Sequence, residues 1–348
     1  METRVSIIVP VFNRGECAAV LVDSLRCQRF AAWEAILIDD GSAPEHREQW
    51  LAAIAGDERM VYRQRDREPK GAPTCRNIGL GAARGDLVIF LDCDDALGDE
   101  TCLEERVAAM DADASLDFVV SPTRLFREQP GDGRTYHNRR VASPDLDELL
   151  RRDNPWQTTG PTWRRSFLER LGEWDEALPG WQDWDFNVRA LCLGPNYRRI
   201  DGGMSWWRVG HGSTISTRLN ETVYIRSVKA MLLATSARLE RAGLLTERRR
   251  RLCGMLLITQ AMGLAKRGLT TEARGMMDAA VENRLMERRV ARLLWVYVLA
   301  SRLPLMSKAV ELALRTCGVP GDYFVPWFLR QGRVPVEKFG GWADEATN

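Results

Sequence analysis

A short apolar run followed at once by three carboxylates is the feature that most restricts how this chain can fold. Residues 87–91 (Leu-Val-Ile-Phe-Leu) are apolar, and Asp92, Asp94 and Asp95 follow them. Such a run is typical of a strand covered on both faces, as in a parallel sheet. Side chains alternate along a strand, so Asp92 and Asp94 would lie on the same side. Two adjacent carboxylates repel each other unless a divalent cation lies between them; the alternative is an acidic turn that caps the next helix.

Strand and helix patterns alternate along the first third of the chain. Expected strands cover residues 5–11, 33–38, a stretch near 61, and 118–120, and expected helices cover residues 18–25, 45–54 and 103–110. This alternation indicates a doubly wound α/β sheet, in which ligands bind beyond the carboxyl ends of the strands. Asn13 and Arg14 follow the first strand, and Asp39 and Asp40 follow the second. One aspartate alone is more often a cap or turn residue, but two strand ends with paired aspartates favour a binding site.

Two further segments lie between and beyond these strand ends. Residues 71–79 (Gly-Ala-Pro-Thr-Cys-Arg-Asn-Ile-Gly) predict a loop that enters a helix. We expect Thr74 to cap this helix and Arg76 to face an anionic ligand, to pair with a nearby aspartate, or to do both. The polar stretch 123–140 predicts a mobile loop or a hairpin.

Composition excludes several classes of protein. The net charge of +1 over 348 residues argues against a strongly basic nucleic-acid surface, so we expect no nucleic-acid partner. The eight cysteines include no Cys-x-x-Cys pair and only three histidines are present, which argues against a zinc site or a disulfide framework and favours a reducing cytoplasm. No signal peptide and no apolar stretch of membrane-spanning length is apparent.

The last third of the chain predicts helices. Apolar spacing marks residues 223–239, 252–264 and 290–305, whereas the tail from Gly318 is irregular. The arginine run 248–251 is expected to form a solvated helix face. Residues 288–300, basic at one end and apolar after it, would lie on an acidic membrane surface or belong to a helical subdomain that packs on the catalytic core or on a second subunit; we favour the subdomain.

The motifs, taken in order, resemble the inverting glycosyltransferases of family two, which use the nucleotide-sugar-binding GT-A fold. The matching segments are residues 6–14, 38–42, 76–79 and 83–95, followed by 162–167, 171–176, 180–185 and 208–216. The resemblance implies a mixed, mostly parallel sheet in a GT-A domain over residues 1–218. Residues 1–120 would be its nucleotide-binding half and 121–218 its acceptor-binding half, with a mainly helical region over 219–348.

The resemblance also implies roles for residues on the donor side. Asp94 and His211 would bind Mn²⁺ or Mg²⁺, although His211 is about as well explained as a loop hydrogen-bonder. Asp92 would lie near the ribose or the metal, Asp40 near the base and Arg76 near the nucleotide. The nucleotide-sugar site would also include Pro10, Val11, Asn13, Arg14 and Cys93. A thiol is a poor partner for a hard cation, so we expect Cys93 to be inert packing.

On the acceptor side, the resemblance makes Asp183 the general base. Gln182 stands where the family usually has glutamate, which leaves the base in place and changes how the acceptor is held. Trp181, Gln182 and Trp184 would bind the acceptor, with helix packing as the alternative for the two tryptophans. Asp185 is expected to support Asp183 or to add negative charge at the helix N-terminus.

These residues predict an enzyme that transfers a single sugar from a nucleotide-diphosphate sugar, UDP-sugar being favoured, to a hydroxyl of a glycan, lipid-linked or small-molecule acceptor. The Gln-x-x-Arg-Trp motif and the membrane spans of processive synthases are absent. Two alternatives remain: a sugar nucleotidyltransferase, which would need a glycine- and lysine-rich loop after the first strand, and a scaffold protein with a decayed site. Contact with the inner face of the membrane and homo-oligomerisation stay open.

Overall fold

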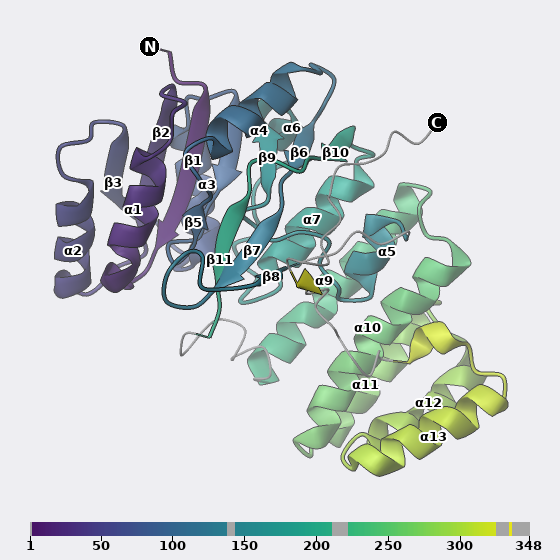
Figure 1. Cartoon of the computed structure of the whole chain (residues 1–348). Helices are drawn as coiled ribbons and strands as arrows, with labels where there is room; N and C mark the ends of the chain where they lie inside the picture. The colour runs from purple at the N-terminus through teal and green to yellow at the C-terminus, as the bar shows by residue number, and fades with distance from the viewer. Residues whose placement is uncertain (1, 138–142, 211–221, 325–333, 336–348) are drawn as a thin grey trace.

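The computed structural model describes residues 2–137, 143–210, 222–324 and 334–335. A seven-stranded sheet with helices on both faces forms the N-terminal part, and a group of helices packs beside it (Figure 1). In spatial order, the strands are β10 (Tyr197–Arg199), β6 (Phe118–Val120), β9 (Pro161–Arg164), β4 (Leu87–Phe90), β1 (Val5–Val11), β2 (Trp33–Asp39) and β3 (Met60–Gln64).

Most pairs in this sheet are parallel. β1 pairs in parallel with β2 and β4, β2 with β3, and β10 with β6, whereas β9 is antiparallel to both of its neighbours. The expected mixed, mostly parallel sheet is therefore confirmed. The register aligns Val11 with Asp39, so the carboxyl ends of β1 and β2 meet at one edge. The residues that follow these strands are consequently brought together.

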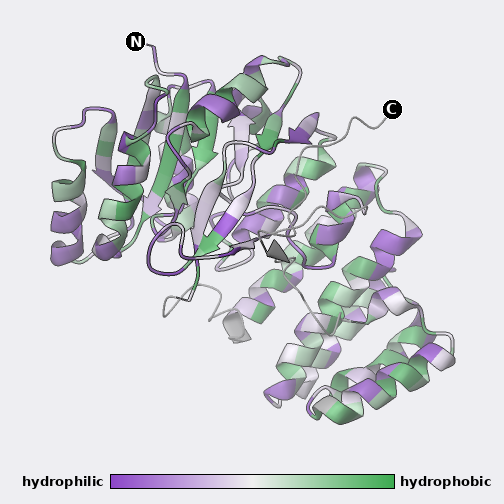
Figure 2. Cartoon of the chain, in the orientation of Figure 1, coloured by the Kyte–Doolittle hydropathy of each residue, from purple (hydrophilic) through white to green (hydrophobic). Residues whose placement is uncertain are grey.

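Helices cover both faces of the sheet because each central strand is apolar on both sides. Ile7 and Ile89 face one cluster, built with α1, α2 and α4, whereas Ile8 and Phe90 face another, built with α3, α6 and α7. Figure 2 shows the apolar colour concentrated in these strands. The helices are α1 (Ala18–Arg26), α2 (Pro44–Ile54), α3 (Ala72–Ala82), α4 (Cys102–Asp111), α5 (Asp145–Leu150), α6 (Arg165–Leu171) and α7 (Gln182–Cys192), with a 3₁₀ turn, η1 (Gly15–Cys17), before α1.

A second, five-stranded sheet consists of short strands, one of which follows closely after β4 in the chain. β11 lies between β7, to which it is parallel, and β5, to which it is antiparallel. β7 and β8 pair in an antiparallel hairpin, one of the two structures expected for residues 123–140. Residues 138–140 of that stretch lie outside the described residues. The strands are β12 (Val334–Pro335), β8 (Thr135–Tyr136), β7 (Thr123–Phe126), β11 (Ser205–Arg208) and β5 (Ala96–Leu97).

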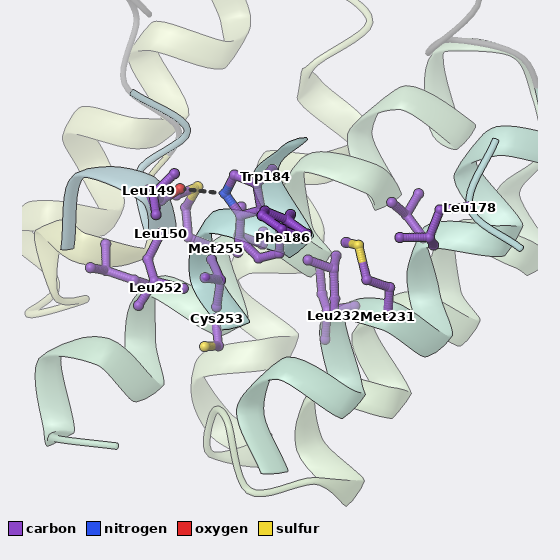
Figure 3. Packing of buried hydrophobic residues seen from close by; sticks show 14 of the residues in the cluster. Leu149, Leu150, Leu178, Trp184, Phe186, Met231, Leu232, Leu252, Cys253 and Met255 are labelled. Atoms are coloured by element: carbon purple, nitrogen blue, oxygen red, sulfur yellow. Dashed lines mark hydrogen bonds between the residues drawn. The ribbon is translucent and has the colours of Figure 1, made fainter. Parts of the chain in front are cut away.

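The C-terminal helices share a core with the sheet domain. Trp184 and Phe186 of α7 belong to the same buried cluster as Leu232 of α9 and Met255 of α10 (Figure 3). The expected helical region is thus confirmed, and it packs on the sheet domain. Its elements are α9 (Thr222–Arg241), α10 (Glu247–Lys266), α11 (Thr270–Glu282), α12 (Arg288–Ala300), α13 (Pro304–Thr316) and the 3₁₀ turn η2 (Gly321–Tyr323). The expected boundary at residue 218 lies outside the described residues.

Three local predictions were wrong. The strand ends at Phe90, and the aspartates lie in a turn closed by a 3.0 Å hydrogen bond from Asp95 N to Asp92 O, so strand alternation does not place them. Thr74 does not cap α3, because it already lies inside the helix; the N-cap is Gly71, with a φ of 144°. The side chain of Arg249 is only 14% exposed, since it pairs with Asp147, so run 248–251 is not a purely solvated face.

Candidate active site

The aspartate turn after β4 concentrates negative charge. Asp92 and Asp94 are half-buried, and Asp95 is buried. The pKa of Asp94 is raised, mainly by burial and next by the charge of Asp92. The pKa of Asp95 is raised well above its usual range, mainly by burial and next by the charges of Asp94 and Asp92. In the described part of the chain, Oδ2 of Asp95 has no hydrogen-bond partner. The negative charges within this turn therefore repel one another.

Two arginines from distant segments contact this turn. Arg76 of α3 donates to Asp92 Oδ1 at 2.6 Å, and its guanidinium lies 4.4 Å from the ring centroid of Trp174. Arg208, the last residue of β11, donates from its main-chain N to Asp95 Oδ1 and from Nε to the carbonyl of Asp94, both at 2.9 Å. Arg76 thus does pair with an aspartate, as one interpretation of the sequence expected. The contacts of Arg208 were missed, although its position at a strand end was a signal.

The turn after β1 adds a third cation. Asn13 and Arg14 have φ values of 56° and 57°, in the left-handed region that few non-glycine residues adopt. Asn13 is fixed there because its N–H donates to Ser42 Oγ at 2.7 Å and its Oδ1 accepts from Ala43 N at 2.9 Å. The positive charge of Arg14 lowers the pKa of Asp94, which places this arginine beside the aspartate turn.

The paired aspartates after β2 differ in their surroundings. Asp39 is fully buried and accepts from both the N–H and the hydroxyl of Ser42, so it holds the local turn. Asp40 Oδ1 accepts from Arg65 Nε at 2.7 Å and from Gly71 N at 3.1 Å. Asp40 therefore links the end of β2 to the start of α3, the helix that carries Arg76.

Pro10, Val11 and Cys93 lie beneath these side chains. Pro10 and Val11 are buried within β1, which leaves only their main chain to face a ligand. Burial, with the charge of Asp94 second, raises the pKa of the Cys93 thiol well above its usual range. The thiol therefore stays protonated at neutral pH.

Asp183 lies in the first turn of α7 and shares its surroundings with the Arg76–Asp92 pair. Burial raises its pKa; the charge of Arg76 lowers it and that of Asp92 raises it, so both residues are near. Asn154 Nδ2 donates to Asp183 Oδ2 at 3.3 Å. Asn154 is a second residue that the sequence did not single out. The proposed base and the proposed donor site are thus brought together.

The residues around Asp183 divide between packing and surface. Trp184 is buried and its indole N–H donates to the carbonyl of Leu149 at 2.7 Å, which favours the helix-packing alternative over contact with the acceptor (Figure 3). Trp181 is half-buried and has a φ of 65°. The side-chain amide of Gln182 donates to the carbonyl of Leu178 at 3.0 Å and so holds the preceding loop.

The structure does not bring every expected residue into the site. His211 lies outside the described residues. Across the described ranges, no three histidine, cysteine or acidic side chains form a metal-binding group. Asp92 and Asp94 nevertheless fit a divalent cation that takes its remaining ligands from substrate phosphate and water. Mg²⁺ and Mn²⁺ favour oxygen ligands, and a cation between the two carboxylates would offset their repulsion.

Comparison with known proteins points to one family. Residues 6–172, slightly less than half of the chain, match the model of Glycosyl transferase family 2. The chain is similar to this family over that stretch. The matched region contains the turns after β1, β2 and β4 and Arg76, whereas Asp183 lies beyond it. Among the helices that the structure describes, none has both the length and the apolar character needed to cross a bilayer.

Proteins similar to this chain include the uncharacterised glycosyltransferase EpsJ of Bacillus subtilis, 28% identical over 59% of this chain and 60% of its own length. A PGL/p-HBAD biosynthesis glycosyltransferase of Mycobacterium bovis is 26% identical over 53% of this chain and 69% of its own. The chain spans about three fifths of the length of the first two relatives.

Solved structures with the same fold include two glycosyltransferase-fold proteins with bound nucleotide sugars. S. aureus TarS 1–349 in complex with UDP-GlcNAc aligns with a TM-score of 0.64 at 17% identity, covering 99% of this chain and all of that one. The mannosyltransferase PcManGT from Pyrobaculum calidifontis, in complex with GDP-Man and Mn²⁺, aligns with a TM-score of 0.50 at 15% identity over 90% of this chain and 88% of its own. These matches confirm the GT-A fold.

Proposed function

We propose that this chain is an inverting glycosyltransferase that moves one sugar from a nucleotide-diphosphate sugar to an acceptor hydroxyl. The observation that supports this most directly is the position of Asp183, whose pKa responds to both members of the Arg76–Asp92 pair. A carboxylate beside the donor site, raised in pKa by burial, is suited to take a proton from an arriving hydroxyl.

The reaction needs only one base. The acceptor hydroxyl attacks the anomeric carbon from the face opposite the diphosphate, and Asp183 takes its proton. The new bond joins the acceptor oxygen to the anomeric carbon as the bond from that carbon to the diphosphate oxygen breaks. The nucleoside diphosphate leaves with the bonding electrons, and the configuration at carbon inverts.

Negative charge grows on the leaving diphosphate, and the chain provides cations for it. Arg14 and Arg208 lie at the aspartate turn, and Arg76 approaches it from α3. A divalent cation held by Asp94 and Asp92 would add Lewis-acid stabilisation of the same diphosphate. UDP is our first choice of nucleotide because S. aureus TarS, which this chain resembles in fold, was solved with UDP-GlcNAc, and GDP is second because the mannosyltransferase carries GDP-Man.

Calorimetric titration of UDP, GDP and dTDP, each with and without Mn²⁺, tests the proposal. We expect one nucleotide to bind clearly more tightly than the others, and EDTA to abolish that binding. Specific nucleotide binding that does not depend on metal would be consistent with the proposed transferase activity but would contradict the proposed cation site. Failure of all three nucleotides to bind would contradict the proposal and favour a decayed site.

A further inference from the structure

The loop after α5 contacts both sides of the first turn of α7. Asn154 of this loop donates to the carboxylate of Asp183, as described above. Two residues earlier, Cζ of Arg152 lies 4.6 Å from the ring centroid of Trp181, the residue that precedes α7. Arg152 and Trp181 both have a φ of 65°, so two strained non-glycine residues meet here. Strain of this kind persists where surrounding structure enforces it, and it is frequent at functional sites.

Among the residues that the structure describes, Arg152 has no counter-ion, unlike the acids that precede it. Every acidic side chain of α5 already has an arginine partner: Asp145–Arg199 at 2.5 Å, Asp147–Arg249 at 2.7 Å and Glu148–Arg151 at 3.0 Å. Within the described ranges, no carboxylate or carbonyl accepts a hydrogen bond from the Arg152 guanidinium. Burial lowers the pKa of Arg152, and no charged side chain contributes to that shift. Arg152 is half-buried, so its guanidinium can still be reached from solution, and pairing with an anion would offset the cost of its partial burial.

The donor phosphates do not account for this anion. They are already matched by Arg76 and Arg208, which contact the aspartate turn directly. The shared loop instead connects Arg152 to Asp183, where the acceptor hydroxyl must arrive.

We infer that Arg152, stacked on Trp181, forms an anion subsite of the acceptor site, and that the acceptor carries a phosphate or carboxylate group. This inference rests on the proposed function and specifies its acceptor class. The planar guanidinium can bind either anion through two parallel hydrogen bonds, and stacking on the indole holds its plane in place. The anion is then separated from the reacting hydroxyl by the span between Arg152 and Asp183.

Calorimetric titration of inorganic phosphate into the full chain, saturated with its nucleotide and Mn²⁺ and held at constant ionic strength, tests the subsite. Because the donor site is filled, remaining phosphate binding reports the acceptor side. We expect Arg152→Gln to weaken this binding at least tenfold and Arg152→Lys to weaken it less. Arg151→Gln removes the same charge from the preceding residue and is the matched control. This variant should bind phosphate as the unmodified chain does.

Acceptor probes then separate the two anions. Glucose 6-phosphate, glucuronic acid and glucose share a sugar ring and differ in charge. We expect the phosphate or the carboxylate probe to bind at least tenfold more tightly than glucose, and this preference to disappear in Arg152→Gln. Equal binding of the charged and neutral probes would overturn the inference.

Three further outcomes have distinct meanings. Loss of nucleotide affinity in Arg152→Gln would assign the arginine to the donor and overturn the inference. A lower unfolding temperature with unchanged phosphate binding would make Arg152 a structural clamp, which also overturns it. If the unmodified chain binds no nucleotide, the proposed function fails; if it binds nucleotide but no phosphate, only the inference fails.

Discussion

The indole N–H of Trp184 donates to the carbonyl of Leu149 at 2.7 Å and thereby ties the residue after Asp183 to the last turn of α5 (Figure 3). α5 is in turn held by the C-terminal helices, because Arg248 and Arg249 of α10 lie 2.9 and 2.7 Å from the carboxylate oxygens of Asp147. A continuous set of contacts therefore runs from α10 to the proposed base. Through these contacts the C-terminal helices contribute to the geometry of the proposed site.

Trp184→Phe removes this hydrogen bond and keeps most of the ring. We expect kcat to fall about fivefold to tenfold, because one hydrogen bond is worth about 1 kcal/mol and the carboxylate beside it loses part of its support. Donor affinity should not change. Trp33→Phe is the matched control, since Trp33 is also buried and its indole N–H has no partner in the described part of the chain. Equal losses of kcat in both variants would show that Trp184 acts only through packing.

Asp147→Asn tests the attachment of α5 to α10. The Asp147 side chain is 6% exposed, and breaking a buried ion pair typically costs about 3–5 kcal/mol. We expect the free energy of unfolding, measured with urea, to fall by about 3 kcal/mol and kcat to fall with it, while nucleotide affinity stays the same. Glu272→Gln, whose partner Arg226 is 60% exposed, should cost less than about 1 kcal/mol. Similar losses in the two variants would contradict a structural role for Asp147.

The periodicity of the sequence was sufficient for the elements but not for the contacts that complete the site. Residues 5–11 and 118–120 form the predicted strands without change. Alternation along a strand does not explain the positions of the aspartates, because the strand ends two residues before Asp92. Arg208 meets Asp94 across 114 residues of chain, and Arg249 meets Asp147 across 102. Such contacts depend on the tertiary arrangement of the helices and strands, which no local pattern encodes.

Asp94→Ala tests the donor side. Removing this carboxylate leaves Asp92, which is already paired with Arg76, as the nearest ligand for a cation. We expect nucleotide binding to lose its dependence on Mn²⁺ and turnover to fall to background, as measured by calorimetry and by release of nucleoside diphosphate. Asp86→Ala, a surface aspartate whose side chain is 71% exposed, is the control. Binding that still responds to Mn²⁺ would remove Asp94 from the cation site.

The pH dependence of activity follows from the raised pKa of Asp183. A general base must be deprotonated, so kcat/KM should fall as pH drops through the pKa of Asp183. Because burial raises this pKa, we expect that fall at a higher pH than an ordinary aspartate would give. A pH–rate profile with saturating Mn²⁺ measures it. A profile that stays flat down to the usual aspartate range, near pH 4, would contradict the assignment.

Asp183→Asn should separate activity from stability. Turnover should fall about 10²–10⁴-fold with donor affinity unchanged, because an amide cannot accept the proton. A carboxyl whose pKa is raised in the folded state destabilises that state at any pH above its folded pKa, so the amide should raise the unfolding temperature near pH 7. The gain should shrink as pH falls and vanish below the unfolded-state pKa, near 4, where the carboxyl is protonated in both states. Thermal unfolding across this range is the measurement, and an unfolding temperature that falls at neutral pH would show that the Asp183 carboxylate stabilises the fold.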